Sequence, residues 1–178
     1  SEEIPVSLEG NSDSFRMKLS FLPNGNCVIL PNINGRGYGF FKITEGGSSG
    51  LWSVLRSSED EVLKGSLLIT LYENLRWKTI SPQGFRDEML AYLPNESNSL
   101  LFSMALSYLG DCQRIFPSDS RPLEQALWKI VTTNPVSQHR LQAFRLYRSI
   151  ADSEEAVQRL YTLWQERKAP KDCALSES

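Results

Sequence analysis

The chain has 178 residues, of which 40% are hydrophobic and 22% are charged, and its formal net charge is −2. A chain of this length and composition can bury a substantial core. The small negative charge gives no long-range attraction for nucleic acid or for an anionic membrane, so we expect neither as a partner. No apolar run approaches the roughly 20 residues that a membrane span needs.

Three cysteines, Cys27, Cys112 and Cys173, are widely spaced and odd in number. This pattern is typical neither of a disulfide framework nor of a metal-binding knuckle. We interpret Cys27 and Cys112 as small buried hydrophobic residues. The sequence starts with Ser-Glu-Glu and has neither an initiator methionine nor a signal-like segment. We therefore expect an excised or mature piece, whose compartment is unknown.

The first quarter of the chain has the period-2 alternation of apolar and polar residues that is typical of β-strands. Four strands are expected, over residues 4–8, 15–21, 27–30 and 38–43. Pro23-Asn24-Gly25 supplies the positive backbone dihedral angles of a hairpin turn. We predict a short antiparallel β portion over residues 1–46, a partial β-sandwich, followed by a flexible joint from Gly46 to Gly50.

From Leu51 onward, apolar residues recur every three or four positions, which predicts six helices joined by short, proline-marked links. Helix starts are marked by side chains that accept hydrogen bonds from the first turn. These are Ser58 with Glu61, Ser81 before Pro82, and Asp152 with Glu155. The predicted fold class is α+β, mostly α: the β portion, a repeat-like α-helical array (an α-α superhelix) over residues 51–168, and a disordered tail over 169–178.

Residues with chemical potential do not form a recognisable site. His139 is the only histidine, so the usual histidine-based zinc set cannot be assembled, and a surface helix position is the favoured interpretation. A Ser-His-Asp triad could be drawn from His139 and any serine, but no nucleophile motif supports it. The glycine-rich stretch Gly35–Gly39 precedes a strand rather than a helix, which favours a structural loop over a phosphate site. The sequence predicts no catalytic residue, no cofactor-binding residue and no metal ligand.

Two residue types leave alternatives open. Four arginines make the late helices locally basic, and a solvated face is favoured over a site for an acidic ligand. They are Arg140, Arg145, Arg148 and Arg159. Four tryptophans fall mostly within apolar periodic segments, so core packing is favoured over substrate stacking. They are Trp52, Trp77, Trp128 and Trp164.

The order of several short motifs resembles the C-terminal part of the zinc aminopeptidases related to aminopeptidase N. That family carries a Trp-x-Ile/Val-Pro strand, an Asn-containing hairpin, Gly-x-Tyr-Tyr-Arg-Val, a Trp-x-x-Leu helix and Leu-x-x-Glu. The matching residues are Ile4-Pro5-Val6, Asn32, Gly37-Tyr38-Gly39-Phe40-Phe41-Lys42-Ile43, Trp52 with Leu55, and Leu93-Pro94-Asn95-Glu96. The match covers residues 4 to about 116. It departs from the family because no tryptophan precedes Ile4 or follows Glu96, and Tyr-Arg-Val is replaced by Phe-Phe-Lys-Ile.

The resemblance implies that this chain is the non-catalytic C-terminal portion of a zinc-dependent aminopeptidase. It would be a scaffold and lid over the active-site cavity and limit peptide access. Zinc would then belong to an upstream catalytic domain of the same polypeptide, which is the expected partner, and peptide substrate would be contacted indirectly. Exposed strand edges in an incomplete sandwich would also invite self-association. The alternative is a freestanding helical-repeat module that binds a protein partner.

Overall fold

The computed structural model describes residue 30, residues 40–43 and residues 47–173, and these are helical with irregular links. The α-helices are joined by short connections, and a single 3₁₀ turn, η1 (Leu93–Asn95), extends the third helix. The α-helices are α1 (Ser48–Ser57), α2 (Glu61–Arg76), α3 (Pro82–Tyr92), α4 (Ser99–Ile115), α5 (Arg121–Thr133), α6 (Ser137–Ile150) and α7 (Glu154–Gln165).

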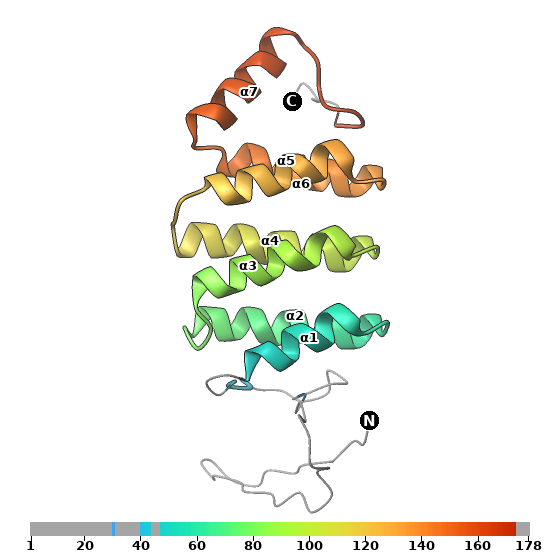
Figure 1. The fold of residues 1–178 in the computed structure, drawn as a ribbon, viewed down its shortest axis with the longest axis vertical. Coiled ribbons are helices and arrows are strands. Elements are labelled where there is room, and N and C mark those ends of the chain that lie inside the picture. The colour runs from blue at the N-terminus through green and yellow to red at the C-terminus, as the bar shows by residue number, and fades with distance from the viewer. Residues whose placement is uncertain (1–29, 31–39, 44–46, 174–178) are drawn as a thin grey trace, which may run out of the picture.

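The helices pair as successive antiparallel hairpins, α1 with α2, α3 with α4, and α5 with α6, which stack along the long axis of the molecule (Figure 1). The α4 helix packs against both α2 and α6, so the second helices of the three hairpins form one continuous layer. The α7 helix lies at the end of the stack beyond α5 and α6. Each hairpin buries an apolar stripe of its helices against the neighbouring hairpin.

The predicted fold class is wrong for the described residues, which contain seven α-helices and no strand. Residues 40–43 belong to the last predicted strand, but they run as irregular chain. The Asn74 side chain of α2 provides the physical reason. Its Oδ1 accepts a hydrogen bond of 2.8 Å from the Ile43 amide, and its Nδ2 donates one of 2.8 Å to the Phe41 carbonyl. These two backbone groups are thus satisfied by one amide side chain. The other three predicted strands lie outside the described residues.

The helix starts follow the capping chemistry, although the capping residue differs from the predicted one at α2 and at α7. The α2 helix is capped by Asp60, whose Oδ1 accepts from the amides of Val62 and Leu63. Ser58, which the sequence predicts as the cap, instead accepts a hydrogen bond from the Asp60 amide. Ser81 caps α3 as predicted, because its hydroxyl accepts a hydrogen bond from the first turn. A carboxylate nearer the helix start has displaced the predicted serine.

Both ends of the predicted array differ from expectation. The supposed flexible joint is partly helical, because α1 begins at Ser48 and contains Gly50. In the predicted tail, Asp172 forms an ion pair with Arg140 of α6, and Cys173 is buried. Residues 169–173 therefore pack onto the body, and burial of an apolar thiol explains why a polar stretch is held in place. Residues 174–178 lie outside the described part.

Candidate functional site

The strongest candidate for chemistry is a contact between Ser99, in the first turn of α4, and His139, in the first turn of α6. The Ser99 Oγ and His139 Nε2 atoms lie 3.1 Å apart. The imidazole also stacks on the Phe102 ring, with centroids 3.9 Å apart. A serine within hydrogen-bonding reach of a histidine is the arrangement that activates a nucleophile. The sequence predicted a surface position for His139, and that prediction is wrong, because its exposed fraction is 0%.

The burial of His139 indicates that its contact with Ser99 has a packing role. A substrate cannot reach an imidazole that has no exposed surface, and His139 Nδ1 has no hydrogen-bond partner in the described part of the chain, so no carboxylate orients the ring. Desolvation lowers the pKa of His139, and the charge of Glu96 opposes that shift only in part. The ring is therefore held neutral between α4 and α6, where it acts as a flat core side chain with one polar contact.

Beside this pair lies a buried carboxylate, Glu96, which follows the η1 turn. Its Oε2 accepts a hydrogen bond of 2.8 Å from Lys64 Nζ and another from the Tyr92 hydroxyl, and its Oε1 accepts one of 2.7 Å from the Asn98 amide. Burial alone raises the pKa of Glu96, but the hydrogen bonds from Lys64, Tyr92 and Asn98 outweigh it, so the pKa is lowered. The carboxylate thus joins α2, α3 and the start of α4 through three hydrogen bonds, of which the one from Lys64 is an ion pair.

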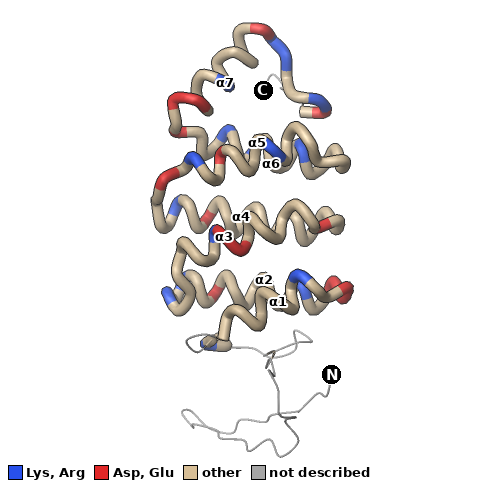
Figure 2. The backbone as a smooth tube through the Cα atoms, in the orientation of Figure 1, with Lys and Arg blue, Asp and Glu red and all other residues tan. Residues whose placement is uncertain are grey.

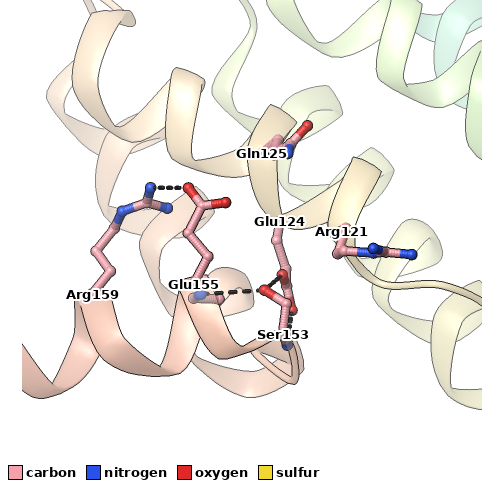
Figure 3. A pocket seen from close by; sticks show the side chains of 7 residues that line it. Arg121, Glu124, Gln125, Ser153, Glu155 and Arg159 are labelled. Carbon is pink, nitrogen blue, oxygen red and sulfur yellow. Dashed lines mark hydrogen bonds and ion pairs between the residues drawn. The ribbon is translucent and has the colours of Figure 1, made fainter.

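A second buried carboxylate, Glu124 of α5, joins α7 to the stack (Figure 3). It accepts hydrogen bonds from the Asp152 and Ser153 amides, at 2.7 and 3.1 Å, and from the Ser153 hydroxyl. Ser153 in turn caps α7 by accepting from the Ala156 amide, so the predicted cap Asp152 is wrong by one residue. Burial raises the pKa of Glu124, yet these hydrogen bonds outweigh it and lower the pKa.

A groove of about 490 Å³ lies between α4 and α6. Polar and apolar groups line it, including Ser107, Asp111, Arg114 and Ser149. Two of its charged groups have partners, because Asp111 pairs with Arg114 and accepts a 2.8 Å hydrogen bond from the Tyr72 hydroxyl. The carboxylate of Asp152, which also lines the groove, is exposed.

The four arginines do not share one solvated face. Arg140 is buried, where it donates to the Asn134 and Pro135 carbonyls and pairs with Asp172. Arg159 lies 4.7 Å above the Trp128 ring and pairs with Glu155. The solvated-face interpretation therefore fails for Arg140. Arg145 and Arg148 are exposed, in keeping with it.

The tryptophans divide in the same way. Trp52 is fully buried and Trp128 half-buried, as core packing predicts. Trp77 and Trp164 have exposed fractions of 70% and 68%, so core packing is wrong for them. They lie at opposite ends of the stack, at the end of α2 and near the end of α7.

Metal chemistry finds no support in the described residues, which contain no group of three His, Cys, Asp or Glu side chains able to hold an ion. Cys112 is buried as predicted, and burial raises the pKa of its thiol. Cys27 and the glycine-rich stretch Gly35–Gly39 lie outside the described part. No helix that the structure describes has the length and apolar character needed to cross a bilayer.

The helical residues of the resemblance are buried in part, since Pro94 and Asn95 on η1 are exposed. Trp52, Leu55 and Leu93 are buried, and so is Glu96. Ser99, Asn74 and Glu124 were missed by sequence reasoning. A polar residue within an apolar stripe could have indicated Asn74, which sits between Leu71 and Leu75.

Comparison with known proteins adds no relative: no protein-family profile, curated protein or solved structure matches this chain. The β-sandwich interpretation is contradicted by the helical structure of the described residues, and the aminopeptidase and zinc interpretations receive no support from these comparisons.

Proposed function

We propose that this chain is a non-catalytic helical scaffold, the C-terminal portion of a zinc-dependent aminopeptidase, that closes over the cavity of an upstream catalytic domain and limits peptide access. The observation that carries the proposal is the pair of hydrogen bonds by which the Asn74 side chain donates to the Phe41 carbonyl and accepts from the Ile43 amide. This buried amide fixes the chain that enters the array to the array itself.

A lid needs such a rigid attachment, because a stack on a loose tether would not limit access to a cavity. Three features extend the attachment. The Ile43 side chain is buried in the core, Thr79 Oγ1 donates to Asn74 Oδ1 at 2.6 Å, and Phe40 packs near Trp77 with ring centroids 5.5 Å apart. The entering segment is thus held by one helix end through both polar and apolar contacts.

A non-catalytic role is also supported by the chemistry of the described side chains. The histidine that contacts Ser99 is fully buried, and the carboxylates Glu96 and Glu124, whose pKa values are lowered, are used to join helices. The second candidate, a freestanding helical-repeat module, is favoured by the groove between α4 and α6, since stacked hairpins commonly bind partners along such surfaces.

The test begins with the reading frame that encodes this chain. We expect an in-frame His-Glu-x-x-His helix upstream, and the complete product should hydrolyse aminoacyl arylamides in a manner that chelation abolishes. In that product, Asn74→Leu should increase hydrolysis of long peptides relative to aminoacyl arylamides, because the lid is loosened. Asn95→Leu is the matched control, since Asn95 is exposed.

Two outcomes would contradict the proposal. One is a complete reading frame that encodes no zinc-binding helix. The freestanding helical-repeat module would then be the remaining candidate function. The other is stoichiometric zinc and peptide hydrolysis in residues 1–178 alone.

A further inference from the structure

The α7 helix has an apolar face of which only half is covered. Its inner side, with Ala156, Leu160 and Leu163, packs against the core. Its outer side carries Val157, Tyr161 and Trp164, whose exposed fractions are 51%, 48% and 68%. We call these three outer residues the α7 stripe.

The members of the α7 stripe are spaced at i, i+4 and i+7, so they lie on one side of the helix. The Tyr161 and Trp164 rings are neighbours, with centroids 5.9 Å apart. The helix has 12 residues, which corresponds to a length of about 18 Å. Contiguous exposed apolar side chains that include aromatic rings are typical of interaction surfaces.

The path of the chain explains why the α7 stripe is bare. The helices α1, α3 and α5 are each followed by an antiparallel helix that packs on them. After α7 the chain instead turns back toward α6, where Asp172 pairs with Arg140 and Cys173 is buried (Figure 1). The described residues that follow α7 therefore do not pair with it as a further helix.

The charges at the two ends of α7 indicate what can cover the stripe. Glu154 begins the helix and Arg167 follows its end, and both are exposed. Neither side chain has an ion pair or hydrogen bond within the described residues. Figure 2 shows the acidic start of α7 and the basic segment beyond its end. An antiparallel copy of the same helix would bring opposite charges together at both ends.

We propose that the α7 stripe is a self-complementary docking surface on which a second copy of this chain pairs antiparallel about a two-fold axis. With the axis near Tyr161, Val157 packs against Trp164 of the second copy, and Glu154 faces Arg167 of the second copy. Each contact occurs twice. The proposal uses residues that the proposed function does not, so either can fail alone.

The small size of this surface sets the expected strength. A single pair of 12-residue helices buries less than the roughly 1,200 Å² of a standard stable interface. Association should therefore be weak, reversible and dependent on protein concentration.

Sedimentation equilibrium of the full chain over a range of concentrations tests the proposal. The wild type should show a monomer–dimer equilibrium, and Trp164→Glu should weaken association at least about tenfold, because the most exposed aromatic side chain of the stripe is lost from both copies and replaced by a charge. Trp77→Glu is the matched control, since Trp77 is as exposed but lies at the other end of the stack. That variant should dimerise like the wild type.

Charge reversal tests the antiparallel register. Glu154→Arg alone, or Arg167→Glu alone, should weaken association by about two- to tenfold. The dissociation constant of the double variant should return to within about twofold of the wild-type value. Both ion pairs are then re-formed with the positions of the two charges exchanged. A chain that stays monomeric at every concentration overturns the proposal. So does a dimer that survives Trp164→Glu, or one that the double reversal does not restore.

Discussion

The α4–α6 interface and the α7 helix use the same amphipathic pattern, with opposite results. At the interface, Phe102 and His139 stack with no exposed surface on either side chain. On α7, Ala156 is the one fully buried residue and Trp164 is mostly exposed. The comparison teaches that an apolar stripe predicts a helix but not its coverage, because coverage depends on which elements the chain places beside it.

The polar contacts sharpen the same comparison. Glu96, between the first two hairpins, has a charged partner in Lys64 as well as neutral donors. The donors that bind Glu124, at the junction with α7, are neutral amides and a hydroxyl. A buried carboxylate without a cation depends entirely on the geometry of its hydrogen bonds. We expect the α7 junction to be the easier of the two to break.

The largest expected effect comes from emptying the interface. Phe102→Ala should lower the free energy of unfolding by about 3–5 kcal/mol, because it removes a fully buried ring and leaves a cavity beside His139. Urea denaturation would measure the change. Leu100→Ala, two positions away on the exposed side of α4, is the control and should change it by less than about 0.5 kcal/mol. Similar losses for the two variants would contradict this packing.

The next effect should appear at the α7 junction. Glu124→Ala leaves the Asp152 and Ser153 amides without their acceptor and should cost about 1–3 kcal/mol. Limited proteolysis should then cut near α7 before it cuts the hairpins.

Glu155→Ala is the control at the same place. It removes an exposed carboxylate paired with Arg159 and should cost less than about 1 kcal/mol. Unchanged proteolysis in Glu124→Ala would show that α7 is held by its apolar contacts alone.

Acidification should weaken the interface through His139. Because burial lowers the pKa of His139 in the folded state, the unfolded chain binds the proton more readily. Its contribution to stability is therefore complete above the unfolded pKa of about 6.5 and declines as the pH falls below that value. The free energy of unfolding of the wild type should therefore be lower at pH 5.5 than at pH 7.5.

The His139→Gln variant isolates that effect, because His139 is the only histidine in the chain. Its stability should change less than that of the wild type between the two pH values. Glu96 and Glu124 have lowered pKa values and titrate at more acidic pH. Identical pH dependence in variant and wild type would contradict a neutral buried imidazole.

The smallest effect distinguishes two helical glycines. A Cβ on Gly65 of α2 would lie 3.8 Å from Leu101 Cδ2, an ordinary contact, so Gly65→Ala should stabilise by about 0.5–1 kcal/mol. A Cβ on Gly110 of α4 would lie 2.8 Å from Leu146 Cδ1 of α6. Gly110→Ala should increase the free energy of unfolding by less than Gly65→Ala does, because the Leu146 side chain must move to accommodate the new methyl group. Thermal denaturation measures both, and an equal gain would show that the α4–α6 contact is loose.

The sequence by itself determined most of the helices, although it predicted six and the described residues contain seven. Apolar spacing and capping side chains act within one or two turns, so they predicted the start of α3 at Ser81 and the burial of Cys112. The cap of α2 was misassigned by two residues, because Asp60 accepts from the first-turn amides of Val62 and Leu63, whereas Ser58 accepts from the amide of Asp60 itself.

Only the tertiary structure decided which polar groups are buried and which apolar groups are exposed. His139, Arg140 and Glu124 are buried because other helices cover them, whereas Trp164 is exposed because nothing described covers α7. The segment at residues 40–43 has strand-like alternation, yet Asn74 takes its hydrogen bonds from 31 residues away. Periodicity reports the local backbone, while burial and backbone pairing depend on contacts between distant residues, which a single sequence does not display.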